Sequence, residues 1–263
     1  MPDFAIIIAG FAVGLIVGLT GVGGGSLMTP ILIFFFGVKP YLAVGTDLLF
    51  AAFTKLGGTV NLARQHLVPW RVVGLLSVGS LPAAIATLMV LRWIGPASDA
   101  VQSVMTHTLG LALLLTAAAM FYKAARGSQL PRTLNGSELA AASQPRHWSL
   151  PVLFGLVIGT LVTLTSVGAG AIGVSALMLL FPLLPLPRIV AADIAYAVPL
   201  TLVAGLGHAS LGSVDWSLLG KLLIGSLPGI WLGTRLMHHT PERLVRSLLS
   251  LLLAYAGTKL ITL

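Results

Sequence analysis

A glycine-rich motif that interrupts apolar sequence occurs twice in this chain. The first copy is Thr20-Gly21-Val22-Gly23-Gly24-Gly25, and the second is Thr165-Ser166-Val167-Gly168-Ala169-Gly170, 145 residues later. Further matches follow at a spacing of 146 residues: Asp47 with Asp193, Trp70 with Trp216, and Gly79-Ser80-Leu81-Pro82 with Gly225-Ser226-Leu227-Pro228. A duplicated apolar unit whose helices break at matching places is typical of transporters with a substrate site at the repeat interface.

The composition predicts an all-α integral membrane protein. Of the 263 residues, 57% are hydrophobic and 8% are charged, whereas soluble domains are about one quarter charged. Uninterrupted apolar segments of bilayer-spanning length cover residues 41–63, 72–90, 101–122, 189–206, 216–237 and 244–263. The N-terminus lacks the basic region of a signal peptide, so we expect the first apolar segment to be retained.

A hydrophilic linker divides the chain into two halves. We assign residues 1–125 to a first transmembrane repeat, 126–147 to the linker and 148–263 to a second repeat. Each half begins with an apolar run that the glycine motif cuts in two, at 4–19 and 26–36 and at 150–164 and 171–184. The second pieces would be roughly 16–21 Å long as helices, too short to cross about 30 Å of hydrocarbon upright.

Two topologies follow from these broken helices. If each broken pair is one span, the halves are parallel repeats; if each pair folds back as a hairpin, the halves have inverted topology. The hairpin arrangement places ten basic residues on one side and only Lys39, Arg92 and Lys259 on the other, whereas the single-span arrangement divides them about seven to six. The positive-inside rule therefore favours inverted repeats, each a broken hairpin plus three transmembrane helices, with a cytoplasmic linker and both termini outside.

The glycine motifs predict an anion site between the broken helices. Glycine permits positive φ and close approach of a ligand, and irregular backbone inside a membrane is tolerated where it is buried or lines a wet cavity. A short helix begins after each motif, near Ser26 and near Ala171, and its free N–H groups and dipole favour an anion. The alternative is that the glycines only allow close helix packing. The matched second copy favours the site.

Lys55 lies in the middle of an apolar segment, too deep to reach a membrane surface easily, and a cation at that depth usually marks a substrate or ion path. It shares a helical face with Asp47 and Thr59. The matching face carries Asp193 and Thr201, so Lys55 has no basic counterpart and we expect one unpaired positive charge in the cavity. A structural Lys55–Asp47 ion pair is the alternative. Eight residues span about 12 Å along a helix, so such a pair would need bending of the helix or the other aspartate, Asp193.

Asp47 and Asp193 are candidates for proton coupling, and structural polar contacts near the start of a helix are the alternative. His208 is a candidate proton relay, although we favour its interpretation as a histidine near a membrane surface. Trp70 and Trp216 each open an apolar segment and fit the aromatic belt at a membrane interface.

Several chemistries are excluded by the motifs that the chain lacks. It contains no G-x-x-x-x-G-K-[ST], no H-E-x-x-H and no G-x-S-x-G, so we expect no enzyme activity, no cofactor and no metal. Cysteine is absent, which excludes disulfides and thiolate metal sites. The net charge of +8 fits basic cytoplasmic loops better than nucleic-acid binding, because no basic run with interleaved aromatic residues occurs.

Motifs in both halves resemble the TauE/SafE sulfite exporter family. The first half carries Gly21-Val22-Gly23-Gly24-Gly25-Ser26 with Pro30, then Ala43-Val44-Gly45-Thr46 and Gly79-Ser80-Leu81-Pro82. The second half carries Gly205 with Gly207-His208, then Val214-Asp215-Trp216 and Gly225-Ser226-Leu227-Pro228. The resemblance implies a transporter of sulfite, sulfonates or related sulfur oxyanions in a bacterial inner membrane. Ser166 and Ala169 stand where the family often has glycine, so the two half-sites are unequal.

Together these observations predict a secondary transporter that works by alternating access around an anion site. We expect backbone N–H donors from Gly23, Gly24, Gly25, Ser26, Gly168, Ala169 and Gly170, hydroxyl groups from Thr20, Thr59, Thr165, Ser166 and Thr201, and positive charge from Lys55. A passive anion channel and a carrier of another small organic anion are the alternatives. The expected partners are the anion and the lipid bilayer, and the small-residue helix faces also permit a homo-oligomer.

Overall fold

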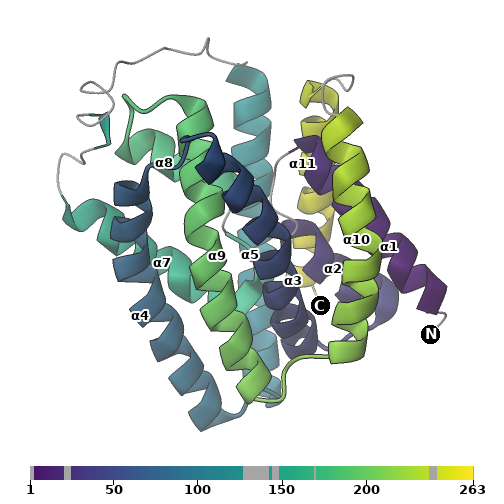
Figure 1. Ribbon diagram of the computed structural model, residues 1–263. Helices are drawn as coiled ribbons and strands as arrows, with labels where there is room; N and C mark the ends of the chain where they lie inside the picture. The colour runs from purple at the N-terminus through teal and green to yellow at the C-terminus, as the bar shows by residue number, and fades with distance from the viewer. Residues whose placement is uncertain are drawn as a thin grey trace.

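The structure, a computed structural model, describes residues 3–20, 25–126, 142–143, 148–168, 170–236 and 242–262. Ten helices and no strands occur in these ranges (Figure 1). The first half contains α1 (Asp3–Thr20), α2 (Gly25–Phe36), α3 (Pro40–Arg64), α4 (Trp70–Ile94) and α5 (Asp99–Arg126). The second half contains α7 (Ser149–Thr165), α8 (Ala171–Leu180), α9 (Leu186–Ser210), α10 (Trp216–Leu236) and α11 (Glu242–Ile261). The predicted all-helical class is confirmed, and the apolar pieces on either side of each glycine motif are separate helices, α1 and α2 in the first half and α7 and α8 in the second.

The helix boundaries follow local backbone chemistry. α4 and α10 begin at Trp70 and Trp216, as the sequence predicts. α8 ends at Leu180, four residues before the end of the predicted apolar segment. The reason is Pro182, because a proline disfavours helical backbone at the residue before it and lacks the N–H that the helix would need.

The first helix of each half packs along the fourth helix of the other half. α1 contacts α10, and α7 contacts α4. A Cβ on Gly10 would lie 2.6 Å from the carbonyl oxygen of Leu222, and the equivalent contact brings Gly155 against the carbonyl of Leu76. Small residues at these crossings let the two backbones approach closely. The spacing of 145–146 residues seen in the sequence thus recurs in the packing.

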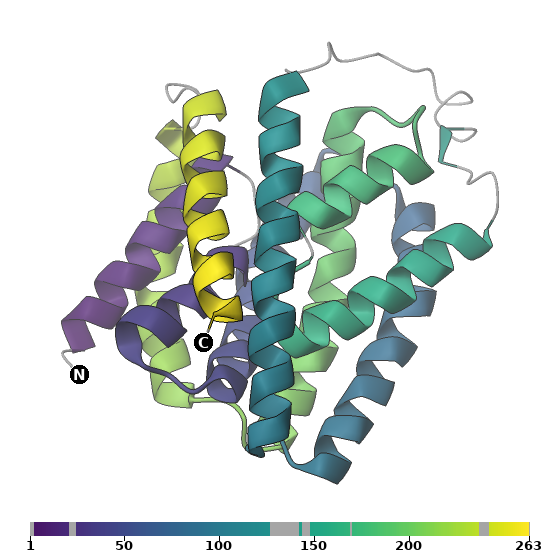
Figure 2. The ribbon, with the colours of Figure 1, turned by 180° about the vertical axis from the view of Figure 1, so that it is seen from behind.

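The third helices of the two halves pack against each other in antiparallel orientation. Gly45 lies against His208, Leu49 against Gly205, and Gly58 against Ile194, so positions rise on α3 as they fall on α9. The fifth helices, α5 and α11, also pack side by side, as Figure 2 shows from behind.

The buried hydrophobic side chains form two cores. One contains residues of α4, α7, α8 and α9, and the other contains residues of α1, α2, α10 and α11. α3 and α5 contribute buried side chains to both cores and lie between the two groups of helices in Figure 1. Residues on α3 therefore face the junction between the two groups.

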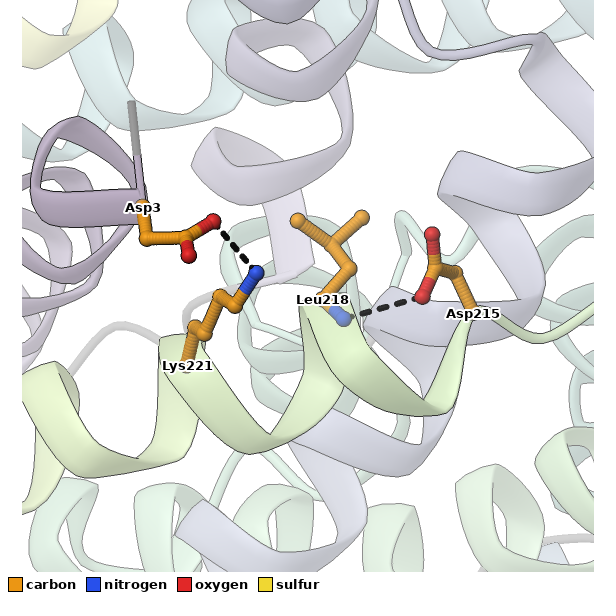
Figure 3. A network of polar contacts seen from close by, with 4 residues as sticks. All are labelled: Asp3, Asp215, Leu218 and Lys221. Atoms are coloured by element: carbon orange, nitrogen blue, oxygen red, sulfur yellow. Dashed lines mark hydrogen bonds and ion pairs between the residues drawn. The ribbon is translucent and has the colours of Figure 1, made fainter. Parts of the chain in front are cut away.

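Two polar contacts lie at the end of the α1–α10 pair where both helices begin. Lys221 on α10 donates to Asp3 at the start of α1, with Nζ and Oδ1 2.5 Å apart (Figure 3). Asp215 accepts a hydrogen bond from the backbone N–H of Leu218 at 2.9 Å, which caps the first turn of α10. The ion pair lies at the surface and is not part of the α3–α9 junction.

The outer surface of the molecule is apolar. Trp93, Leu179 and Phe35 are 90%, 83% and 82% exposed, far beyond what a soluble protein tolerates over many such residues. Three described helices are each long and apolar enough to cross a bilayer: α4, α9 and residues 99–121 of α5. α1, α2, α7 and the Ser247–Ile261 part of α11 are shorter apolar helices.

Candidate functional site

Among the side chains that the structure describes, buried ionisable groups occur on two helices. In the part of the chain with described side chains, the buried ones are Asp47 and Lys55 on α3 and Asp193, Tyr196 and His208 on α9. The other ionisable side chains described there are half-buried or exposed. A charge inside an apolar protein is unfavourable unless it is paired or used. The α3–α9 junction is therefore the candidate site.

Asp47 is fully buried and connects the two halves. Its Oδ2 accepts a hydrogen bond from Thr29 Oγ1 on α2 at 2.5 Å, and Thr29 is itself fully buried. The hydroxyl of Ser166, which ends α7, lies near the same carboxylate. Oδ1 of Asp47 and Oγ of Ser166 have no hydrogen-bond partner among the described residues. Asp47 thus faces the helix break of the opposite half.

Asp193 occupies the matching position on α9. Its carboxylate lies directly against Gly173 in the first turn of α8, where a Cβ would be 3.1 Å from Cγ of the aspartate. Tyr196, one turn further along α9, is fully buried and interacts electrostatically with Asp193. Each aspartate therefore contacts the short helix of its own half. Asp47 contacts α2, and Asp193 contacts α8.

Lys55 lies between the two aspartates. It is 7% exposed and interacts electrostatically with both carboxylates, with Asp193 more strongly than with Asp47. The sequence-based expectation of one unpaired positive charge is therefore wrong. The reason is the antiparallel crossing, which brings Asp193 of the second half within range of a lysine in the first.

The second helix break is built by one threonine and three residues of unusual conformation. Thr165 Oγ1 bonds the carbonyls of Leu161 and Val167 at 2.7 and 3.0 Å, and the N–H of Val167 donates back to it at 3.1 Å. Ser166 adopts φ +60°, and Gly168 and Gly170 adopt φ +138° and +142°. The last two conformations strongly favour glycine.

Two backbone carbonyl groups at this break already accept hydrogen bonds from the start of α8. The N–H of Gly173 donates to the carbonyl of Gly168 at 3.1 Å, and the N–H of Val174 donates to the carbonyl of Gly170 at 2.8 Å. The Thr165 hydroxyl is engaged in the turn, whereas Ser166 Oγ has no described partner. Ser166 therefore supplies the hydroxyl group at this break that can still bind a ligand or a neighbouring side chain.

The remaining predicted residues divide by position. Thr59 and Thr201 are buried on α3 and α9, and Thr201 Oγ1 donates to the carbonyl of Ala197 within its own helix at 2.8 Å. Gly23, Gly24 and Ala169 lie outside the described residues, as do the side chains of Thr20 and Ser26. Gly25 is the first residue of α2.

His208 is not a surface residue, contrary to the sequence-based interpretation. It is fully buried, and its Nε2 lies 2.9 Å from the carbonyl oxygen of Thr163 on α7. A carbonyl only accepts, so Nε2 carries the hydrogen. Its Nδ1 has no hydrogen-bond partner among the described residues. α3 covers it, because a Cβ on Gly45 would lie 3.1 Å from the histidine Cβ.

Sequence reasoning missed two polar neighbours of the aspartates, Thr29 and Tyr196. A signal for Thr29 was present, because Ser175 stands 146 residues later and repeats its hydroxyl. Nothing comparable marks Tyr196, whose match at that spacing is Phe50.

The chain is similar in sequence to proteins named probable membrane transporters. The chain is 35% identical over 257 residues to the probable membrane transporter protein YjnA of Bacillus subtilis, covering 98% of this chain and 99% of the relative. It is 26% identical to the probable membrane transporter protein YdhB of Bacillus subtilis, covering 97% and 99%. A probable membrane transporter protein of Xylella fastidiosa is 24% identical, covering 87% and 82%. No solved structure matches the chain significantly.

The family model described as sulfite exporter TauE/SafE matches residues 6–260, nearly the whole chain. The relatives are named probable membrane transporter proteins and not enzymes, in agreement with the absence of catalytic motifs. The apolar helices and apolar surface agree with several membrane crossings. The chain therefore belongs to the TauE/SafE sulfite exporter family of membrane transporters.

Proposed function

We propose that this protein is a secondary transporter of small sulfur-containing anions, sulfite or organosulfonates, that works by alternating access around the α3–α9 junction. The observation that carries the proposal is Lys55, the only buried lysine or arginine among the described side chains. It lies where two halves with matching helix breaks meet, which is the arrangement of substrate sites in repeat transporters. The sulfur chemistry comes from the family to which the chain belongs.

The two repeats, 1–125 and 148–263, have inverted topology in this proposal. The support is that equivalent helices run in opposite directions: α3 is antiparallel to α9 at their crossing. Repeats related by an axis along the membrane normal would keep equivalent helices parallel. The α4–α5 and α9–α10 connections also lie at the same end of the molecule in Figure 1, which agrees with the inverted arrangement.

The basic residues orient the molecule in a bacterial inner membrane, with the linker 126–147 in the cytoplasm and both termini outside. The chain has no cysteine, so single cysteines can be labelled without background. We expect Asn135→Cys and His239→Cys to react from the cytoplasmic side and Ala97→Cys and Ser210→Cys from the outside. Labelling of all four from one side would exclude the inverted topology.

The anion is held by groups from both breaks and by Lys55. Backbone N–H groups come from Gly23, Gly24, Gly25, Ser26, Gly168, Ala169 and Gly170. Hydroxyl groups come from Thr20, Thr59 and Ser166, and from Thr165 and Thr201 once their internal hydrogen bonds to backbone carbonyls open. The N-termini of α2 and α8 and the ammonium group of Lys55 supply the positive potential.

Thermal unfolding of the purified protein tests this site. Sulfite, sulfate, thiosulfate and a series of alkyl and aryl sulfonates are added separately, and an anion that binds the folded state stabilises it by RT ln(1 + [L]/Kd), about 2.7 kcal/mol at 100 times Kd. Lys55→Ala should remove the shift, whereas Lys221→Ala, at the surface, should keep it. A full shift in Lys55→Ala would remove Lys55 from the site.

Flux separates a carrier from a channel. In proteoliposomes, we expect uptake of the binding anion to saturate and to be accelerated by unlabelled anion on the other side. Uptake that rises linearly with concentration and shows no counterflow would identify a passive channel.

A further inference from the structure

The α3–α9 junction holds more negative than positive charge. Asp47 and Asp193 are 0% and 2% exposed, and Lys55 is 7% exposed, so three formal charges sum to −1 when all are ionised. Charges removed from water are unfavourable unless compensated. An anionic substrate would add a second net negative charge. The junction can take up that anion without becoming more negative only if it gains a positive charge as well.

A proton is the positive charge that this junction can accept. The other buried ionisable groups on α3 and α9 are Tyr196, beside Asp193, and His208, bonded to Thr163 on α7. The described parts of α2, α7 and α8, which pack around the two aspartates, contain no ionisable side chain. The aspartates are the acidic groups that flank Lys55, so a proton on either of them offsets the charge of the anion next to Lys55.

The two aspartates lie at different heights along the crossing, with Lys55 between them. Eight residues separate Asp47 from Lys55, about 12 Å along α3. On the other side, Gly58 packs against Ile194, so Asp193 lies at a level only about 6 Å from Lys55 along the helix axis. Along the helix axis Lys55 is therefore nearer to Asp193 than to Asp47 in this conformation.

We propose that Lys55 is shared between Asp47 and Asp193, and that the aspartate it leaves carries the transported proton. In this proposal Lys55 is paired with Asp193 and the proton is on Asp47 in the conformation described here. When the helices rearrange, Lys55 pairs with Asp47 and Asp193 takes the proton. One proton then accompanies one monovalent anion, and the cargo is electrically neutral.

The contacts of Asp47 suit a proton that binds and leaves. Its Oδ2 is held by Thr29, while its Oδ1 has no hydrogen-bond partner among the described residues. A protonated Oδ1 can donate to the nearby Ser166 hydroxyl, and an ionised Oδ1 can accept from it. Because Ser166 ends α7, protonation of Asp47 in the first half changes a contact at the helix break of the second. The residue 145 positions before Ser166 is Gly21, so this hydroxyl has no match in the first motif.

Infrared spectroscopy of the carboxyl groups tests the sharing directly, without a substrate. In the purified protein, the difference between acid and alkaline spectra should contain a carboxylic-acid C=O band from the junction. Asp47→Asn and Asp193→Asn should each lose this band completely, because the remaining aspartate pairs permanently with Lys55. Asp99→Asn, at the exposed start of α5, is the control and should keep it.

The spectra distinguish the alternatives. If only one asparagine variant loses the band, that aspartate alone carries the proton and Lys55 is not shared. If both variants keep the band, neither aspartate is the proton carrier. Lys55→Met should increase the band by a second carboxylic acid, and an unchanged band in a folded variant would also overturn the sharing.

A transport measurement keeps this inference separate from the proposed function, on which its link to transport rests. Methanesulfonate is the probe, because it stays monovalent at every pH used. With one proton per anion, a gradient of one pH unit should drive about tenfold accumulation in wild-type proteoliposomes. Asp47→Asn and Asp193→Asn should still exchange labelled methanesulfonate but accumulate none. Accumulation in either variant would overturn the proton coupling, whereas absence of exchange in the wild type would contradict the proposed substrate and leave the infrared result standing.

Discussion

The glycines of α4 and α10 offer a direct test of the helix packing. Gly79 and Gly74 lie on the same helix, α4. A Cβ on Gly79 would lie 2.9 Å from the backbone N of Leu156 and would overlap the carbonyl of Val152, both on α7. A Cβ on Gly74 would meet nothing within 4 Å. Alanine at the two positions should therefore have opposite effects on the free energy of unfolding.

The magnitude follows from the two contributions. Replacing glycine by alanine favours a helix by about 1 kcal/mol at either position, and this gain is common to both variants. Overpacking of a tight contact costs about 1–3 kcal/mol, and it applies only at Gly79. The two variants should therefore differ by about 1–3 kcal/mol, or about 2–12 °C in Tm for a chain of this size. Gly74→Ala should unfold at or slightly above the wild-type temperature.

Thermal unfolding of the purified protein, followed by circular dichroism at the helix band, measures the difference. The other half of the chain contains a second matched pair, because a Cβ on Gly225 would lie 2.8 Å from the backbone N of Phe11, whereas one on Gly220 would meet nothing within 4 Å. Gly225→Ala and Gly220→Ala should repeat the result. Equal Tm shifts within each pair would refute the close packing of α4 on α7 and of α10 on α1.

Three further substitutions probe individual contacts, each by the change in Tm. Thr29→Val should lower the free energy of unfolding by about 1–3 kcal/mol, because the buried carboxyl group of Asp47 loses its 2.5 Å hydrogen bond. The control Thr54→Val loses only an intrahelical bond and should cost less than about 1 kcal/mol. Equal losses would contradict the Thr29 contact. His208→Leu should cost about 1–3 kcal/mol through loss of its buried hydrogen bond, and a neutral result would contradict its burial. Lys221→Met should cost about 1 kcal/mol or less, and the effect should shrink in high salt, because this ion pair is at the surface; a larger, salt-independent loss would contradict that position.

The helix pattern could be predicted because it depends on local properties. The length of an apolar run, a glycine break and a proline stop act on neighbouring backbone, so α1 and α2 lie within two residues of the segments expected at 4–19 and 26–36. The error at the end of α8 has the same origin, since Pro182 stops the helix inside a segment whose hydropathy continues. Its effect was readable from the sequence.

The site was predicted in part. Lys55, Asp47 and Asp193 could be selected because a charge inside apolar sequence is rare and usually functional. Which aspartate Lys55 meets could not be decided from the sequence, because Asp193 comes near Lys55 only through the antiparallel crossing of α3 and α9. His208 was placed at the surface because it lies near the end of its segment, whereas α3 and α7 cover it.

The sequence by itself determined that this is a helical membrane protein of two similar halves, each opened by a broken helix, because hydropathy and backbone conformation are local. Only the tertiary structure decided which helices meet: α1 with α10, α7 with α4, and α3 with α9. A helix that is apolar on all sides has no polar face to indicate its partner. The partners are set by shape, through glycine contacts between residues more than 70 positions apart, and these contacts decide which charges share the interior.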